Sequence, residues 1–118
     1  MKPCISCNIE VLSVPGEAAL VISIPAEAVP DAVVLLTAML YGKYNRINFA
    51  DKSCTAALSA SDGYALNLED KQIAVTKVWV EAFLGMLLDV CLHGWSDTAH
   101  LDQDFENLSV AVAVLPPY

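Results

Sequence analysis

The sequence has few basic residues, and its last third has none. It contains six lysines and arginines against fourteen aspartates and glutamates, which gives a net charge of −8. Residues 1–77 hold all six basic residues and carry a net charge of −2, whereas residues 78–118 carry −6. Binding to nucleic-acid phosphates or to an anionic membrane needs a basic surface, so this charge argues against both partners. It is compatible with a basic protein partner, although the more common reason for an acidic surface is solubility.

The sequence also lacks the short motifs of catalysis and cofactor binding. Its five glycines are scattered singly, so it has no phosphate-binding glycine loop and no nucleophile elbow. Serine, histidine and aspartate are present, but their spacings specify no catalytic triad. These absences favour a protein that is not an enzyme and that binds no cofactor.

Long apolar runs without charges are missing too. The longest apolar stretches carry central charges or end after about a dozen residues, short of the roughly twenty that span a bilayer. Near the start of the chain, Asn8 and Glu10 interrupt any apolar run of the kind found in secretion signals. We therefore expect a protein without membrane spans, located in the cytoplasm.

The sequence predicts one α+β domain over residues 1–118. Of these residues 56% are hydrophobic, which is enough for a substantial core. Alternating apolar residues and turn signals predict strands over residues 5–14, 18–24, 54–60, 64–68 and 108–115. Helices are predicted over 31–41 and 73–92, and loops over 42–53 and 96–107. The expected order is β-β-α-β-β-α-β, with a mostly antiparallel sheet packed by two apolar helices.

The second predicted helix, residues 73–92, has too little polar surface for a helix on the outside of a monomer. Lys77, Glu81, Gly85 and Asp89 recur every fourth residue and form one narrow stripe, and nearly all other positions are apolar or small. A surface helix normally keeps about half of its circumference polar. This helix therefore needs cover on several sides, and self-association is one way to provide it.

One side of this helix is the candidate interface: Val75, Trp79, Met86 and Val90 lie away from the best core-facing positions. An alternative makes residues 73–80 a strand, because many of them are β-branched.

The last predicted strand, residues 108–115, alternates large and small side chains. Its large residues share one face, and Ser109, Ala111 and Ala113 share the other. Small side chains let another element approach closely, so we expect a central strand that is covered on both faces.

Cysteines and histidines offer an alternative function that involves metal binding or catalysis. Cys4 and Cys7 have the spacing of a zinc knuckle, which two of Cys54, Cys91 and His93 could complete. His93 and His100 also stand near several carboxylates that could bind a metal or transfer protons. Against this, free cysteines are usually small buried residues, and the histidine-containing segment also fits a solvated acidic loop.

The interpretation that these observations favour is a small acidic protein that acts by binding another protein. An inhibitor, an immunity-type protein and an assembly subunit all fit, and self-association into a homo-oligomer such as a homodimer is expected. Aromatic anchors beside carboxylates are typical of contact surfaces. The candidate partner-binding residues are therefore Trp79, Met86, Trp95, Asp97, Asp102, Asp104 and Glu106.

Overall fold

The computed structural model describes residues 3–14, 17–50, 55–68, 71–105 and 108–117, which form a single α+β domain. The elements in chain order are β1 (Cys4–Ser6), β2 (Asn8–Val14), β3 (Glu17–Ile24), the 3-10 turn η1 (Ala26–Ala28), α1 (Val29–Leu40), β4 (Arg46–Ala50), β5 (Thr55–Ser59), β6 (Tyr64–Asn67), β7 (Gln72–Val75), α2 (Lys77–His93), β8 (His100–Phe105) and β9 (Leu108–Val114). The predicted fold class is confirmed.

The strands form two sheets. Sheet A has the order β1-β4-β5-β6-β7, and sheet B has the order β2-β3-β9-β8. All neighbours are antiparallel except β1 with β4 and β3 with β9. Cys7 joins β1 to β2, and its N–H donates to the carbonyl oxygen of Ala50 in β4 at 3.1 Å. The first predicted strand is therefore one extended segment that passes from sheet A to sheet B.

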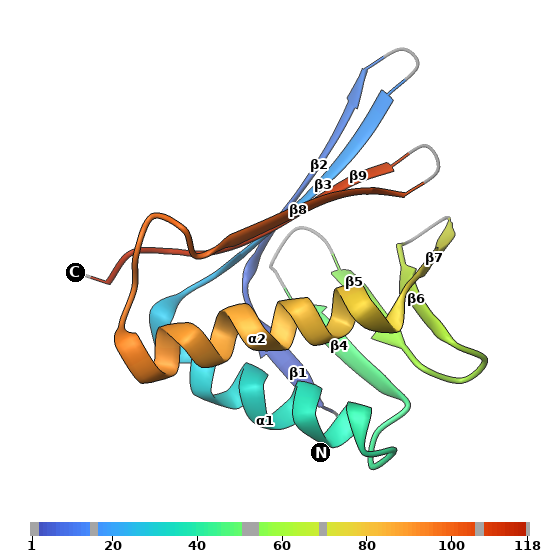
Figure 1. Cartoon of the computed structure of the whole chain (residues 1–118). Coiled ribbons are helices and arrows are strands. Elements are labelled where there is room, and N and C mark those ends of the chain that lie inside the picture. The colour runs from blue at the N-terminus through green and yellow to red at the C-terminus, as the bar shows by residue number, and fades with distance from the viewer. Residues whose placement is uncertain (1–2, 15–16, 51–54, 69–70, 106–107, 118) are drawn as a thin grey trace.

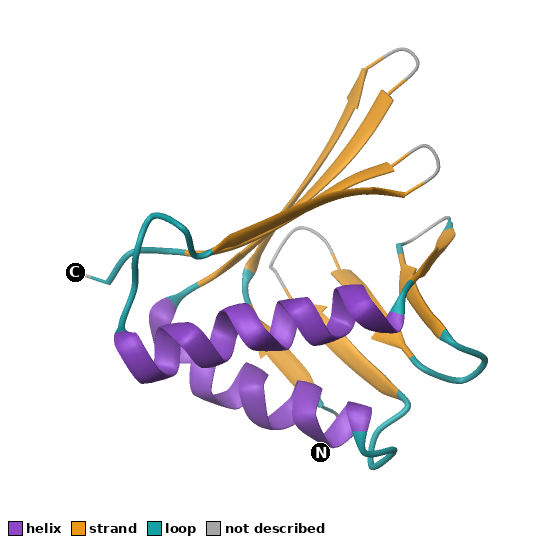
Figure 2. Cartoon of the chain, viewed as in Figure 1, coloured by secondary structure: helices purple, strands orange, loops and turns teal. Residues whose placement is uncertain are grey.

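The helices lie side by side and share one face of the sheets, as Figure 1 shows. Figure 2 shows the same arrangement as a layer of helices in front of the strands of sheet A and below sheet B. Apolar side chains at alternate strand positions point toward the helices: Ile9, Leu20, Ile22, Val110 and Val112 are all buried. The hydrophobic core therefore fills the space between the helix layer and both sheets.

Four aromatic rings run through this core from one sheet to the other. The Trp79 ring of α2 lies 5.6 Å from Phe83 and 5.8 Å from Phe105 of β8, measured between centroids. Phe83 in turn lies 6.2 Å from Phe49 of β4. Trp79 is 1% exposed, and its indole N–H has no acceptor in the described part of the chain.

The segment predicted as one helix over residues 73–92 is a strand followed by a helix. Ile73 pairs with Leu66 of β6, and Ile73 and Val75 are buried, so the β-branched residues complete sheet A. Thr76 then caps α2, because its hydroxyl oxygen accepts a hydrogen bond from the Trp79 N–H at 3.0 Å. The strand alternative is correct up to Val75, and the helix prediction is correct from Lys77 onward.

Both predicted loops contain strands. Residues 42–53 include β4, in which Ile47 and Phe49 are buried on alternate positions. Residues 96–107 include β8, an edge strand on which only Phe105 is fully buried. An edge strand needs few apolar residues, because one side has no neighbouring strand and one face can remain in water. The observed order therefore contains more strands than β-β-α-β-β-α-β.

The last strand, β9, is central in sheet B, as predicted, but only one of its faces is fully covered. Val110 and Val112 are buried, whereas Ala111 and Ala113 are half-buried and Ser109 is exposed. The expectation of cover on both faces is wrong for the described residues, since both helices pack on the same side of the sheet.

Replacing Trp79 with alanine should destabilise the fold by about 3–5 kcal/mol, because it leaves a cavity among Phe83, Phe105 and their neighbours. Urea denaturation followed by circular dichroism measures this loss. Trp95→Ala is the control: this ring is 39% exposed, and its Nε1–H donates to the Val114 oxygen at 2.8 Å. The control should cost only about 1 kcal/mol. Equal losses would contradict the aromatic core described above.

Candidate functional site

The outer face of sheet B, on the side away from the helices, is a surface of small side chains. Its centre comes from the paired strands β3 and β9, which contribute Ala19, Val21, Ser23, Ser109, Ala111 and Ala113. Five of these residues are half-buried and Ser109 is exposed. The face is therefore an open floor on which another molecule can approach the strand backbones closely.

Carboxylates stand along both edges of this floor. On β2, Glu10 lies in register with Val21, and on β8, Asp102 lies in register with Ala111. Asp104 is the next residue of β8 on the same face, and its Oδ1 accepts a hydrogen bond from the Ser109 hydroxyl at 2.6 Å. Among the described residues of this face there is no lysine and no arginine. The three carboxylates give the face one sign of charge.

The described basic residues belong to other parts of the molecule. Lys43 follows α1, Arg46 begins β4, Lys71 precedes β7 and Lys77 is the first residue of α2. None of them is in sheet B. The charge difference between the two parts of the sequence is therefore also a difference between faces of the folded domain.

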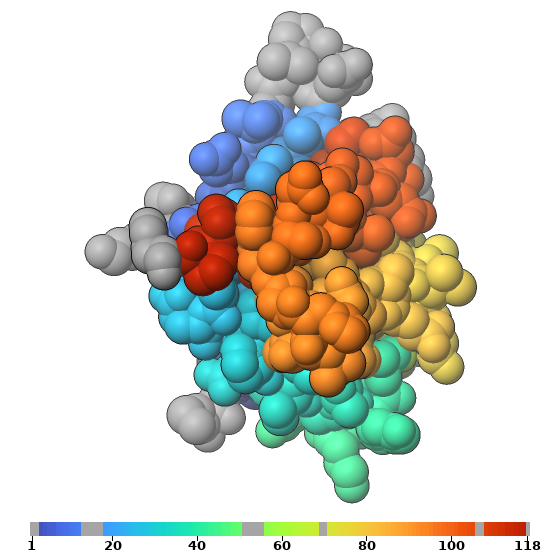
Figure 3. Space-filling view, turned by 60° about the vertical axis from the view of Figure 1, so that its left-hand side comes forward, coloured from blue at the N-terminus to red at the C-terminus, as the bar shows by residue number. Residues whose placement is uncertain are grey.

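Several predicted contact residues lie together at one edge of sheet B. Asp102 and Asp104 project from β8 instead of from a loop, and both are exposed. Asp97 lies close by, since its carbonyl oxygen is 3.2 Å from Nδ1 of His100, the first residue of β8. Trp95 is held against the end of β9 by its hydrogen bond to Val114. Figure 3 shows the segment after α2 on the surface between that helix and the strands of sheet B. Glu106 lies outside the described residues.

Two predicted contact residues on α2 do not lie on the surface as expected. Trp79 is in the core, and Met86 is half-buried and packs against the core. The same is true of their predicted neighbours, because Val75 is buried and Val90 is half-buried. The expected interface on this side of the helix is therefore wrong. The reason is that sheet B packs against this side of α2, where Phe105 of β8 contacts the ring of Trp79.

Sequence reasoning missed Glu10 and the alanine floor as parts of the site. The signal was present, since Asn8, Glu10 and Leu12 occupy alternate positions and must share one strand face. The sequence could not show that β2 and β8 form opposite edges of one four-stranded sheet. That pairing depends on contacts between segments far apart in the chain.

The alternative metal or catalytic sites are not assembled by the described residues. Cys4 is exposed and Cys7 is buried, with its Sγ 3.8 Å from the Ala50 oxygen, so the two thiols do not converge. His93 lies 3.9 Å from Asp89, both well exposed on α2, while His100 is in β8. Within residues 3–14, 17–50, 55–68, 71–105 and 108–117, no three His, Cys, Asp or Glu side chains are grouped to hold a metal ion. Cys54 lies outside these ranges.

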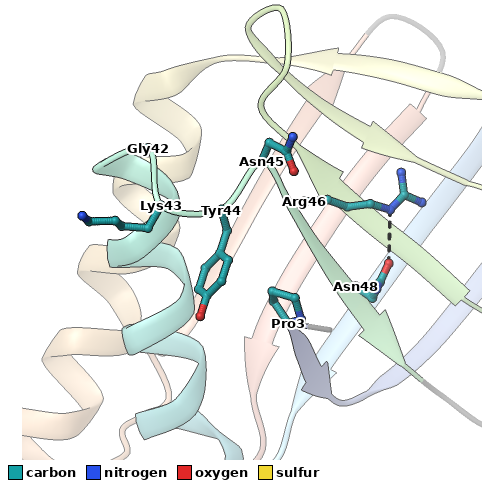
Figure 4. Close-up of a pocket in the computed structure, with 7 residues that line it drawn as sticks. All are labelled: Pro3, Gly42, Lys43, Tyr44, Asn45, Arg46 and Asn48. Carbon is teal, nitrogen blue, oxygen red and sulfur yellow. Dashed lines mark hydrogen bonds between the residues drawn. The ribbon is translucent and has the colours of Figure 1, made fainter. Parts of the chain in front are cut away.

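A cleft of about 530 Å³ lies between the end of α1 and the start of β4. It is lined by Pro3, Gly42, Lys43, Tyr44, Asn45, Arg46 and Asn48. Figure 4 shows that the side chains of Lys43 and Arg46 point in different directions, and Arg46 Nε donates to Asn48 Oδ1 at 3.3 Å. The two cations therefore do not converge on a common ligand.

No family model, curated protein or solved structure matches this chain. In the described part of the chain, neither helix has the length and hydropathy needed to cross a bilayer.

The carboxylates at the β8 edge should contribute little to stability, since both are exposed. The double variant Asp102→Asn/Asp104→Asn should unfold within about 0.5–1 kcal/mol of the unchanged protein. The Ser109 hydrogen bond can be kept by the asparagine oxygen. Thermal and urea unfolding measure the difference. A loss of several kcal/mol would show that these side chains support the fold and do not form a surface reserved for binding.

Proposed function

We propose that this protein is a non-enzymatic binding protein that covers a positively charged surface of another protein with the outer face of sheet B. One observation carries the proposal: an open floor of small residues lies between two edges on which the described residues include carboxylates but no lysine or arginine. An inhibitor, an immunity-type protein and an assembly subunit would each work by covering such a surface.

The composition of the face suits a basic partner. Small side chains such as Ala111 and Ala113 let lysine or arginine side chains lie across the sheet, with their alkyl stems on the floor. Their charged ends then reach the carboxylates of Glu10, Asp102 and Asp104. Complementary charge increases the rate of encounter and selects against acidic proteins.

A second copy of this chain does not fit the same face. Two such faces would bring carboxylates from both copies together with no basic residue between them, and like charges repel. Trp95, beside the end of β9, is a suitable aromatic anchor at the margin of the face. Free thiols at Cys4 and Cys91, both exposed, fit a reducing compartment, so we propose the cytoplasm as the location.

The proposal is tested by capturing partners from a lysate of the source cell with tagged protein and identifying them by mass spectrometry. Asp102→Asn/Asp104→Asn should weaken capture of the true partner about fivefold, because two exposed charge pairs are worth about 1 kcal/mol together. Ala111→Arg should abolish capture, since it blocks the floor and repels a basic surface. Raising the salt concentration should weaken binding of the unchanged protein.

Matched variants separate this surface from general charge effects. Glu27→Gln/Asp62→Asn removes two exposed carboxylates outside sheet B, and Ala74→Arg makes the same substitution on the exposed side of β7. Both controls should capture the partner like the unchanged protein. If the controls lose the partner as readily as the test variants, the outer face of sheet B is not its binding site.

A further inference from the structure

The side of α2 that faces solvent is largely apolar. Val78 is 73% exposed and Leu92 is 75% exposed, and Leu88 is exposed between them. We call this surface the α2 pole, which consists of Val78, Glu81, Ala82, Gly85, Leu88, Asp89 and Leu92, all of them exposed. It is a different surface from the outer face of sheet B.

Gly85 lies at the centre of the α2 pole, and no contact within the described part of the chain requires a glycine there. A Cβ atom at this position would meet nothing within 4 Å, and the residue has ordinary helical geometry. Glycine is the least favourable residue in a helix interior apart from proline. Its use here is explained if another backbone approaches the helix at this point, as small residues permit.

We infer that α2 packs antiparallel against α2 of a second copy, with the two Gly85 residues at the crossing point. At about 100° per residue, Val78 and Leu92 lie within about 20° of Gly85, two turns away on either side. A two-fold axis beside Gly85 therefore places Val78 of each copy opposite Leu92 of the other. The ends of the contact are aliphatic pairs, and its centre is small enough for close approach.

The charges on the α2 pole select this orientation and this occupant. In a parallel pair, Glu81 would face Glu81 and Asp89 would face Asp89 of the other copy. In the antiparallel pair, Glu81 and Asp89 lie about 40° to opposite sides of Gly85. Each then meets an apolar or small neighbour, Leu88 or Ala82, and keeps its carboxylate at the solvent-exposed margin. The surface is thus complementary to itself only when antiparallel.

The first helix, α1, enlarges the surface available for the contact. Stable interfaces bury about 800 Å² per partner, more than one pair of short helices supplies. α1 lies beside α2 on the same side of the sheets (Figure 1), and its Val34 is 65% exposed. Tyr41, just after α1, is 80% exposed. These side chains extend the apolar surface next to the α2 pole.

Gly85→Gln tests the inference. Sedimentation equilibrium from low to high micromolar concentration should show a dimer for the unchanged protein. The variant should dimerise at least about tenfold more weakly, because its side chain fills the crossing point. At concentrations where both proteins are monomers, the variant should melt about 2–4 °C higher, since glutamine is the better helix former. A loss of dimer combined with a more stable monomer cannot result from misfolding.

Ala82→Gln and Ala74→Gln provide a matched pair. The same substitution is made at an exposed alanine on the α2 pole in one case and on β7 in the other. Ala82→Gln should weaken the dimer, and Ala74→Gln should leave it unchanged. An unchanged protein that stays monomeric at high micromolar concentration would overturn the inference. A dimer that Gly85→Gln and Ala82→Gln leave intact would overturn it as well.

Discussion

The chain of four aromatic rings through the core determines how the rest of the molecule is arranged. Phe49 belongs to sheet A and Phe105 to sheet B, and the rings of Phe83 and Trp79 in α2 lie between them. One side of a single helix is thereby packed against both sheets. Aromatic pairs at these separations add to the energy of burial and prefer particular ring angles. These ring contacts therefore also fix how α2 is rotated about its axis.

The rotation of α2 creates the two exposed surfaces. With Trp79 and Phe83 turned inward, Gly85 and its apolar neighbours must point to solvent. Because sheet B uses its inner face to cover the core, its small-residue face is left open on the opposite side. The surfaces differ in chemistry: one is apolar with a glycine at its centre, and the other is small and edged with carboxylates. They therefore fit different occupants.

The sequence was informative where side-chain periodicity and burial agree. The alternation in β3 and β9 predicted both strands and their inward faces, and Pro30 with Gly42 placed both ends of α1 within two residues. It was not informative for β8, whose exposed residues resemble those of a loop. It was also ambiguous at Ile73–Val75, where β-branched residues precede Thr76. The Thr76 cap that starts α2 is a local hydrogen bond to the Trp79 N–H, whereas the strand before it depends on the pairing of Ile73 with Leu66 of β6.

The candidate site was predictable in its charge but not in its shape. The lack of basic residues after Lys77 directed attention to Asp97, Asp102 and Asp104, and the structure places Asp102 and Asp104 exposed on β8. Trp79 was misassigned, because a nearly all-apolar helix does not reveal which of its sides meets the core when two sheets pack on it. Hydrophobic patterning distinguishes a covered side from an open one only if the open side is polar.

The two surfaces can act together, because they face away from each other. The inner face of sheet B lies toward α2, so a dimer formed through the α2 pole leaves the outer face of sheet B free in both copies. Such a dimer presents two equivalent acidic faces. A basic partner that is itself repeated, or that offers two basic patches, would then be held by both faces at once. The second binding event is intramolecular, and its effective concentration strengthens binding without any new contact. Weak individual charge pairs at the edges of the sheet are sufficient for tight binding under that condition.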